Sequence, residues 1–431
     1  MSADRRVVIT GMSVNTPLGD TLDGFLAALL AGQSAVTRWK RFAAAPIYSK
    51  VGADLSDYDI TAKVDSWEGR LPDERYRLLR RFAARAPWST KLSVLIALDA
   101  FADAGLLAGQ DGIASGLRTC VLVAGHNINL NYQFESRLQF AAEPDYIDSM
   151  FSVHGLDTDH AASVAEMIGA RGPTYTVGGA CASGNIALRN ALDEIRYHDV
   201  ERCVVLGAVF DLSPIDLHAM ALMGAISCEG FNDDAPRASR PYDVRREGFV
   251  PAHGGAALVV EALDSATRRG ARIYAEVLGV EANSDANHLP QPSEEGQLAV
   301  MTKLLDRCRV APGDIDFISA HATSTPLGDL TEIRSIRRLI GTHARRVKIN
   351  APKSMLGHTC WSAPTVETVA AVLQMRASRL HQSINIDQRD PEIDLDVCEH
   401  AACDCTVGHL LKNSFGFGGI NCVSLFKRYE P

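Results

Sequence analysis

A β-branched run passes through two glycines and a cysteine into a helical pattern at Thr174-Tyr175-Thr176-Val177-Gly178-Gly179-Ala180-Cys181-Ala182-Ser183-Gly184-Asn185. Apolar residues then recur at helical spacing, so the stretch predicts a strand, a tight turn and a helix. The turn places Cys181 at the positive end of the helix dipole, where we expect the thiolate to be stabilised and the sulfur to act as a nucleophile. A buried structural cysteine would fit the same turn equally well.

The rest of the chain alternates short β-rich runs with longer stretches of helical period. This pattern is typical of buried parallel strands joined by helices, so we expect an α/β fold. No glycine-, serine- or proline-rich linker divides the 431 residues, which predicts one compact body. The expected strands are 6–10, 119–124, 203–210, 256–261, 317–321, 347–350 and 422–427, and the expected helices are 92–104, 185–197, 295–307 and 365–376.

The two halves of the chain resemble each other weakly. A strand runs into His126 in the first half and into His321 in the second. A glycine-rich turn occurs at Gly178-Gly179 and again at Gly416-Phe417-Gly418-Gly419. Paired features of this kind are what a fused duplication would leave behind.

Two stretches in the second half carry side chains suited to catalysis. One strand delivers His321 into a hydroxyl-rich loop that contains Thr323 and Thr325. Farther along, Lys353 and His358 lie five residues apart just before an expected helix. Imidazole, hydroxyl and ammonium groups facing one cleft would suit proton transfer or charge stabilisation, although each stretch alone is equally typical of an ordinary loop.

The glycine-rich turn at Gly416-Phe417-Gly418-Gly419 lies near the end of the chain. Its flexible backbone is suited to pointing an N–H group at a substrate carbonyl. The glycine spacing does not match a dinucleotide-binding loop, and no helical pattern follows it.

Taken together and in this order, Cys181, His321, Lys353, His358 and the turn at 416–419 resemble the β-ketoacyl synthase family of fatty-acid and polyketide biosynthesis. The resemblance covers almost the whole chain and includes Val8-Ile9-Thr10-Gly11-Met12 and Ala238-Ser239-Arg240-Pro241-Tyr242-Asp243. It implies a thiolase-like, five-layered αβαβα fold made of two similar halves, residues 1–265 and 266–431. Members of the family are usually homodimers.

The resemblance also implies an acyltransferase that acts on thioesters. Cys181 would take the acyl group from the phosphopantetheine arm of an acyl carrier protein, and the backbone N–H groups of Cys181 and Phe417 would hold the oxyanion. Phe417 would gate the acyl pocket, and Thr323 and Thr325 would bind the phosphopantetheine amides. Beyond that carrier-borne arm, we expect no cofactor.

In the same resemblance, His321 and His358 would hydrogen-bond the carbonyl of a malonyl thioester and stabilise the enolate that decarboxylation leaves. This role requires neutral imidazoles whose Nε2–H groups face the substrate. Lys353 would hold and electrostatically tune the second histidine.

Two departures from the family pattern lie close to these residues. His253 stands where the family usually has a glutamate that pairs with the active-site lysine, so we expect Lys353 to lack a counter-charge and to hold its proton less tightly. Trp361-Ser362-Ala363-Pro364 replaces a glycine- and alanine-rich run after the second histidine. We expect the Trp361 indole to fill space near the catalytic cavity, so that a long acyl chain does not fit.

These departures are similar to those of free-standing decarboxylases from polyketide β-branching cassettes, which convert malonyl carrier protein to acetyl carrier protein. That subgroup commonly carries serine at the nucleophile position, whereas this chain keeps Cys181. Cysteine favours condensation through an acyl-enzyme, and its altered surroundings favour decarboxylation. Both reactions remain open, and we give the decarboxylase interpretation first place.

Other functional classes fit the residues less well. A non-catalytic partner subunit, similar to the chain-length factors of aromatic polyketide pathways, would lose the nucleophile and part of the histidine pair, and both are present here. A degradative thiolase shares the fold but uses a second catalytic cysteine, for which Cys422 is the candidate. An α/β-hydrolase needs a glycine two residues after its nucleophile, where this chain has Ser183.

Composition limits the partners. Lysine and arginine number 43 and aspartate and glutamate 52, which gives a formal charge of −9 and argues against a nucleic-acid binder. No apolar run approaches the length of a membrane span, and the 10 cysteines stand apart as in a reduced cytoplasmic protein. We expect no metal: the spacing of one cysteine and histidine group matches no standard zinc motif. That group is Cys398, His400, Cys403, Cys405 and His409.

An acidic carrier protein would need positive charge on this acidic chain. Two arginine-rich helical stretches are the candidates for docking, although either is equally typical of a solvated helix face. The first contains Arg75, Arg77, Arg80, Arg81 and Arg85, and the second contains Arg334, Arg337, Arg338, Arg345 and Arg346.

Overall fold

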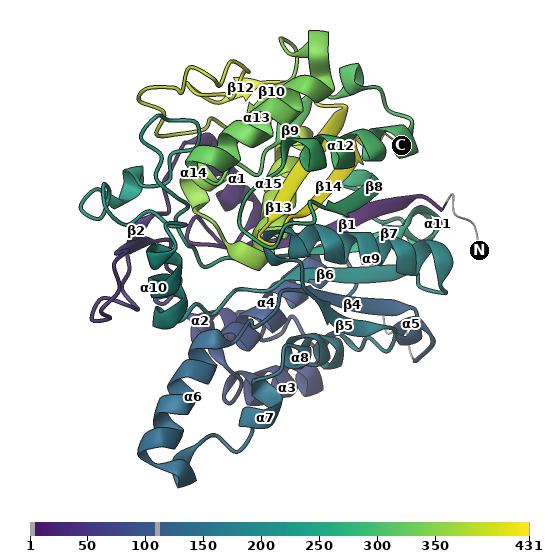
Figure 1. The fold of residues 1–431 in the computed structure, drawn as a ribbon. Coiled ribbons are helices and arrows are strands. Elements are labelled where there is room, and N and C mark those ends of the chain that lie inside the picture. Colours follow the sequence, from purple (N-terminus) through teal and green to yellow (C-terminus); the bar gives the residue numbers. More distant parts are fainter. Residues whose placement is uncertain (1–4, 108–112, 431) are drawn as a thin grey trace.

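The computed structural model describes residues 5–107 and 113–430. Within them, a 10-stranded sheet runs in the order β10-β9-β13-β14-β8-β1-β7-β6-β4-β5 (Figure 1). Two short strand pairs, β2 with β3 and β11 with β12, lie outside it. The strands are β1 (Val7–Asn15), β2 (Thr37–Arg38), β3 (Val51–Gly52), β4 (Thr119–Ala124), β5 (Thr174–Val177), β6 (Arg202–Gly207), β7 (Gly255–Ala262), β8 (Ala275–Ser284), β9 (Phe317–Ser319), β10 (Lys348–Asn350), β11 (Arg379–Leu380), β12 (Cys403–Asp404), β13 (His409–Gly416) and β14 (Ile420–Lys427).

The large sheet consists of two five-strand groups with the same internal order. From the outer edge to the centre, one group runs β5-β4-β6-β7-β1 and the other runs β10-β9-β13-β14-β8. In both groups, therefore, the third strand along the chain is outermost, followed by the second, fourth, fifth and first. The two first strands, β1 and β8, pair antiparallel at the centre, where Val7 lies opposite Val277. The repeated order shows the two similar halves of the predicted fold.

The internal match expected from sequence is correct in one part and wrong in the other. His126 follows the second strand of its group and His321 follows the second strand of the other, so these residues occupy corresponding places. The glycine-rich turns do not correspond. Gly178-Gly179 follows the third strand of one group, whereas the turn at 416–419 follows the fourth strand of the other.

Helices cover and separate the two strand groups. Helices α9 and α15 pack between the groups, α4 and α8 pack on the first group, and α12 and α13 pack on the second. The helices are α1 (Leu22–Leu30), α2 (Ile60–Asp65), α3 (Asp73–Ala83), α4 (Trp88–Asp103), α5 (Ile113–Leu117), α6 (Leu130–Ala142), α7 (Phe151–His154), α8 (Thr158–Ile168), α9 (Ser183–Tyr197), α10 (Pro214–Leu222), α11 (Leu263–Arg268), α12 (Glu294–Cys308), α13 (Pro326–Ile340), α14 (Lys353–Leu356) and α15 (Ala363–Ala377).

The alternation of side chains along the buried strands produces three large hydrophobic cores and hence five layers. Leu122 of β4 points into the middle core with residues of α9 and α15, whereas its neighbours Val121 and Val123 point into the outer core beneath α4 and α8. On the other side, Ile318 of β9 joins the third core with residues of α12 and α13. The predicted αβαβα fold is therefore confirmed.

Each strand and helix expected from sequence is present; the strand over 119–124 has the expected ends, and the others are shifted at one or both ends. The clearest shift is at the strand expected over 203–210, which ends at Gly207. Beyond that residue the chain leaves the sheet, and Phe210 joins a separate apolar cluster with Trp39 and Cys360.

Candidate active site

A cavity of about 400 Å³ brings together residues from both halves of the chain. Cys181, His321, His358 and Phe417 line it, as do the predicted phosphopantetheine-binding residues. Those residues are Thr323 and Thr325, whose hydroxyl oxygens lie 3.1 Å apart. Lys353 lies behind the cavity wall and reaches the site through His321.

The cysteine turn connects β5 to α9 through a single 3₁₀ turn, Ala180–Ala182. Ala180 has a positive φ of 47°, and the Ser183 hydroxyl accepts a hydrogen bond from the Gly179 N–H (2.9 Å) and donates one to the Ala180 carbonyl (2.7 Å). These bonds fix the turn, so the Cys181 side chain is aimed at the cavity.

The expected stabilisation of the resting thiolate is not found. Burial raises the pKa of the Cys181 thiol to about 11, although Lys353 and the N–H groups of Phe417 and Cys181 itself oppose the shift. The side chain is 7% exposed, so the loss of hydration outweighs the favourable charges. At neutral pH, burial therefore keeps Cys181 in the protonated thiol form.

The second strand group supplies the other side of the nucleophile turn. A Cβ atom at Gly416 would lie 2.8 Å from the Gly179 carbonyl oxygen and 3.2 Å from the Cys181 nitrogen, so only glycine permits β13 to come this close. The approach brings the Phe417 N–H beside the Cys181 sulfur, together with the N–H of Cys181 itself. Two backbone donors thus lie where the oxyanion of a thioester adduct would form.

The hydrogen bonds of the two histidines define their tautomers. Nδ1 of His358 accepts the Cys360 N–H at 3.2 Å, which leaves the ring proton on Nε2. Nδ1 of His321 lies 3.4 Å from Nζ of Lys353, and an ammonium group can only donate, so His321 also carries its proton on Nε2. In the described part of the chain, Nε2 of His358 has no hydrogen-bond partner.

Both imidazoles are neutral at pH 7. Burial lowers the pKa of His321 well below its usual value, and Lys353, His358 and Lys412 lower it further. Burial lowers the pKa of His358 in the same way, with Lys353 and Lys412 adding to the effect. The rings meet edge to face with their centroids 5.5 Å apart, so two uncharged N–H donors converge on one side of the cavity.

The expectation that Lys353 lacks a counter-charge is wrong. Its ammonium contacts Oε1 of Glu367 at 2.5 Å and donates to the His321 carbonyl at 2.6 Å. Glu367 lies on α15 and is as deeply buried as Lys353. Sequence patterns did not identify Glu367, because its contact with Lys353 depends on how α14 and α15 pack together.

His253 lies apart from this group. Its Nδ1 is 3.3 Å from Oδ1 of Asp54, and its ring packs edge-on against Trp39 and Trp88. Burial lowers the pKa of His253 despite the opposing effect of Asp54. His253 does not line the cavity, so it belongs to the scaffold beneath the site.

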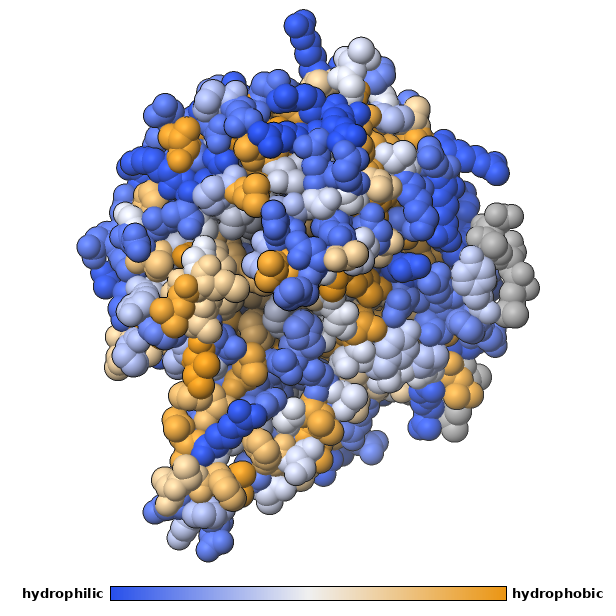
Figure 2. Space-filling view, in the orientation of Figure 1, coloured by the Kyte–Doolittle hydropathy of each residue, from blue (hydrophilic) through white to orange (hydrophobic). Residues whose placement is uncertain are grey.

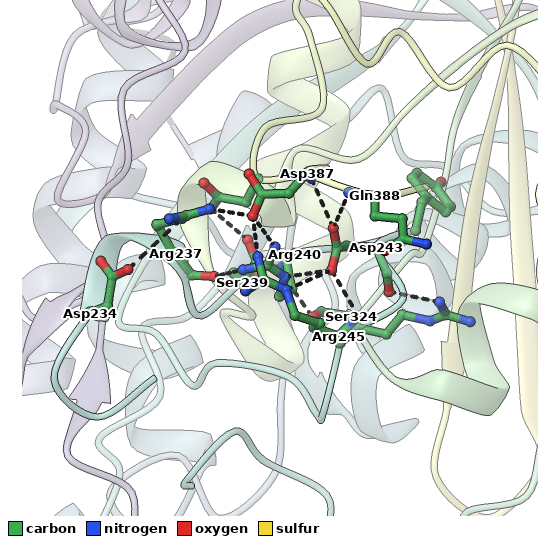
Figure 3. A network of polar contacts seen from close by, with 12 residues as sticks. Asp234, Arg237, Ser239, Arg240, Asp243, Arg245, Ser324, Asp387 and Gln388 are labelled. Carbon is green, nitrogen blue, oxygen red and sulfur yellow. Dashed lines mark hydrogen bonds and ion pairs between the residues drawn. The ribbon is translucent and has the colours of Figure 1, made fainter. Parts of the chain in front are cut away.

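A polar network, which motif reasoning did not identify as part of the site, holds the threonine loop (Figure 3). Ser324 has a φ of 67°, and its hydroxyl accepts the Arg240 N–H at 3.0 Å. The Arg240 side chain in turn bonds to Asp243 (2.9 Å) and Asp387 (2.6 Å). The signal was present in the stretch Ala238-Ser239-Arg240-Pro241-Tyr242-Asp243, which served only as a mark of the family.

Trp361 fills space behind the cysteine and does not line the cavity. Its indole stacks on the imidazole of His126, with centroids 4.3 Å apart and an interplanar angle of 29°, and Phe210 packs against it at 5.1 Å. A Cβ atom at Gly178 would lie 3.0 Å from the His126 ring, so the stack is pressed against the cysteine turn. Sequence reasoning identified Trp361 and missed His126 as its partner.

Within residues 5–107 and 113–430, no three histidine, cysteine, aspartate or glutamate side chains are grouped as a metal site requires, and this includes the group from Cys398 to His409. No helix in the same ranges has the length and apolarity needed to cross a bilayer.

Comparisons with known proteins agree with the geometry. The family model described as beta-ketoacyl synthase, N-terminal domain, matches residues 4–266, and the corresponding C-terminal domain matches residues 274–387. The polyketide biosynthesis malonyl-ACP decarboxylase PksF of Bacillus subtilis is 31% identical over 428 residues, which is 98% of this chain and 97% of that protein. A 3-oxoacyl-[acyl-carrier-protein] synthase 2 of Coxiella burnetii is 32% identical over 432 residues, which is 98% of this chain and 99% of that protein.

Solved structures are similar over the same length. One is a type II polyketide ketosynthase in complex with its acyl-carrier protein, with a TM-score of 0.85, 26% identity and coverage of 99% of this chain and 100% of that chain. Another is a beta-ketoacyl synthase from Burkholderia phymatum, with a TM-score of 0.84, 28% identity and the same coverage.

Proposed function

Because the chain belongs to the β-ketoacyl synthase family, we propose that it decarboxylates a malonyl group carried on an acyl carrier protein and leaves acetyl carrier protein, as in polyketide β-branching. The single observation that carries this proposal is the pair of neutral histidines, each with its proton on Nε2 and both lining the cavity beside Cys181. The same cavity holds the thiol and both backbone donors, so decarboxylation and thiol chemistry share one site.

Decarboxylation needs a way to stabilise the electron pair of the broken bond, which stays with the thioester fragment. When the bond between the carboxylate and C2 of the malonyl group breaks, CO₂ departs and the electrons move into the thioester as an enolate. The Nε2–H groups of His321 and His358 donate to the enolate oxygen and stabilise it without giving up a proton. The enolate carbon then takes a proton from water, and the product is an acetyl thioester.

The packing behind the cysteine supports a small acyl group. The His126–Trp361 stack and Phe210 fill the space on that side of the cysteine turn. A malonyl or acetyl group attached to a phosphopantetheine arm needs no room there, whereas a long acyl chain on the sulfur would need to displace the stack.

Condensation is the alternative. Cys181 would attack an acyl thioester, the N–H groups of Cys181 and Phe417 would hold the oxyanion, and the carrier thiol would leave. The malonyl-derived enolate would then attack acyl-Cys181 in place of being protonated, and the cysteine would be released. The retained thiol and the close approach of Gly416 to its turn favour this alternative. A non-catalytic partner subunit, similar to a chain-length factor, would need neither the thiol, nor the two backbone donors, nor the histidine pair.

An acyl carrier protein is the proposed partner, and its phosphopantetheine arm would enter past the Thr323 and Thr325 hydroxyls. Of the two arginine stretches, the one on and just after α3 is available for docking. Arg77, Arg80, Arg81 and Arg85 are exposed, and within the described residues none forms an ion pair. On α13, by contrast, Arg334 pairs with Glu392, Arg337 with Asp394, and Arg338 with Glu294 and Glu295. Only Arg345 and Arg346, beyond the end of that helix, are exposed and without an ion pair among the described residues.

The proposed assembly is a homodimer. Among the described residues, strand β5 lies at one end of the sheet order and pairs only with β4. Next to this edge in the chain, α6, α7 and their connection expose apolar side chains, and Figure 2 shows orange and tan residues gathered where Figure 1 places α6. Leu138, Phe140, Tyr146, Met150, Val153 and Leu156 form this patch. A patch of this kind is typical of an interface.

Replacing the nucleophile tests the proposal. Cys181→Ala should abolish condensation and leave the release of CO₂ from malonyl carrier protein intact, because the enolate donors are the histidines. Intact-protein mass after incubation with acetyl and malonyl carrier protein would show whether Cys181 holds an acyl group during turnover. Loss of decarboxylation in Cys181→Ala, together with an acylated wild type, would favour condensation.

A further inference from the structure

The proposed mechanism makes no use of one buried ammonium group close to the site. Lys412 lies in the middle of β13, and its side chain is fully buried. Its Nζ lies 2.7 Å from Oε2 of Glu367 and 3.2 Å from the Ser414 hydroxyl, and it also donates to the Asn413 carbonyl. One ion pair and two hydrogen bonds therefore surround the Lys412 ammonium group, as a buried charge requires.

Glu367 is held by two lysines. Lys412 contacts one of its carboxylate oxygens, and Lys353 contacts the other at 2.5 Å. The remaining donors of Lys353 are directed at the carbonyl oxygen and Nδ1 of His321. A continuous series of contacts therefore runs from Lys412 through Glu367 and Lys353 to the imidazole that faces the cavity.

The charges in this buried group do not cancel within it. Two ammonium groups share one carboxylate, which leaves one positive charge in excess. A further buried carboxylate, Glu332 on α13, accepts the backbone N–H groups of His321 and Ala322 and the side-chain amide of Asn413, and it stabilises the Lys412 charge without contacting it. Burying two ammonium groups is costly in free energy, so a second lysine at this place calls for a reason.

We propose that Lys412 is a positioning residue that fixes Glu367, and through it Lys353, so that His321 keeps its proton on Nε2 and presents it to the enolate. This inference rests on the proposed function, since it assigns Lys412 a part in the same enolate stabilisation. A carboxylate held by one lysine alone can rotate, whereas one held at both oxygens has a single orientation.

The charge of Lys412 also helps to keep both active-site imidazoles neutral. The titratable groups around Lys412 are Glu367 on α15, Lys353 on α14, Glu332 on α13 and Cys422 on β14, and His321 and His358 lie beyond them. A nearby cation disfavours protonation of an imidazole, and Lys412 lowers the pKa of both histidines. Its removal raises those pKa values, so the imidazoles become charged at a higher pH than in the wild type.

The test compares wild type with Lys412→Met by NMR of protein labelled at histidine, titrated from about pH 9 to pH 5. His321→Gln and His358→Gln assign the two signals. We expect both imidazoles to become charged at a higher pH in Lys412→Met than in the wild type, because the variant lacks a cation that lowers both pKa values. This readout needs no turnover, so it stands even if the chain proves to condense and not to decarboxylate.

Lys427→Met is the matched control, because it removes an exposed lysine from the adjacent strand β14 and should leave both titrations unchanged. Lys412→Gln, which can still hydrogen-bond to the Ser414 hydroxyl, serves if the methionine variant does not fold. Where malonyl decarboxylation is measurable, the acid limb of its pH profile should move upward with the NMR titration. Identical histidine titrations in wild type and both Lys412 variants would overturn the proposal.

Discussion

The indole of Trp361 stacks on the imidazole of His126 at a centroid distance of 4.3 Å. In the fold topology, Trp361 of the second half corresponds to Cys181 of the first half, and His126 of the first half corresponds to His321 of the second half. Trp361 and Cys181 are the middle residues of the 3₁₀ turns that lead into α15 and α9, and His126 and His321 each follow the second strand of their group. Cys181 and His321 line the cavity, whereas the corresponding Trp361 and His126 are stacked rings.

The stack should limit the acyl chain that Cys181 accepts. We expect wild type to be acylated by acetyl thioesters and not by octanoyl thioesters, and Trp361→Ala to accept both, because the space behind the turn is opened. Intact-protein mass after incubation with each thioester measures this. Trp88→Ala, which removes an indole that packs on His253, is the control and should leave chain length unchanged. Octanoylation of wild type would contradict the prediction.

The histidine donors should dominate decarboxylation. His321→Ala and His358→Ala should each slow CO₂ release from malonyl carrier protein by about a hundredfold or more, since each removes one donor to the enolate oxygen. The exposed His198, at the far end of α9, provides the control. A rate within a few-fold of wild type in either active-site variant would remove the mechanism.

Buried neutral histidines should make the fold sensitive to acid. Burial lowers the pKa of His381 to about 4, while the unfolded chain titrates near the ordinary value of 6.5. Below pH 6.5 the unfolded state binds the proton that the folded state refuses, so stability is complete above that pH and is lost as pH falls towards 4. His381 alone should cost roughly 3 kcal/mol across this window.

Denaturant unfolding at pH 7.5 and pH 5 measures this effect. In His381→Gln the difference in unfolding free energy between the two pH values should shrink, and in the exposed His198→Gln it should match wild type. An unchanged difference in His381→Gln would show that His381 titrates freely in the folded protein.

The unpaired arginines of the first stretch should be needed for turnover of substrate bound to the carrier protein and not for turnover of a small thioester. Replacing Arg77, Arg80 and Arg81 together by glutamine should lower kcat/KM for malonyl carrier protein about tenfold and leave a small malonyl thioester unaffected. The ion-paired Arg334, Arg337 and Arg338, replaced in the same way, are the matched control. Equal effects of the first triple variant on both substrates would count against docking at α3.

The apolar patch on α6 and its connection to α7 should hold two copies together. Light scattering should give wild type a mass of twice the 46.5 kDa of one chain. The double variant Leu138→Glu, Tyr146→Glu should have the mass of a single chain. Val244→Glu changes an exposed apolar residue away from the patch and should preserve the dimer. A monomeric wild type would end this part of the proposal.

The fold and the family were predictable because both leave local signals in the sequence. Alternating runs with apolar faces predicted the strands and helices, and the order of Cys181, His321, Lys353 and His358 predicted the family, which the family models confirm. The residues that surround these four were harder to predict from the sequence. Glu367 was missed as the partner of Lys353, because a buried ion pair between α14 and α15 depends on packing and not on any local motif.

The protonation of Cys181 could not be predicted for a related reason. The turn at the start of α9 favours a thiolate, but the pKa also depends on how completely the second half of the chain covers the sulfur, and that burial raises it to about 11. His126 was likewise seen only as one member of a weak repeat, because stacking with Trp361 requires the two halves to be placed together.

The close approach of Gly416 to the cysteine turn has a consequence for how the enzyme comes into being. During synthesis, the first half can form its strands, its turn and its thiol long before the β13–β14 hairpin exists. Until that hairpin docks, Cys181 has one backbone donor and no second wall, so a growing chain carries the nucleophile without the means to use it. The complete pair of backbone donors therefore exists only after the last strands of the chain have docked on the first half.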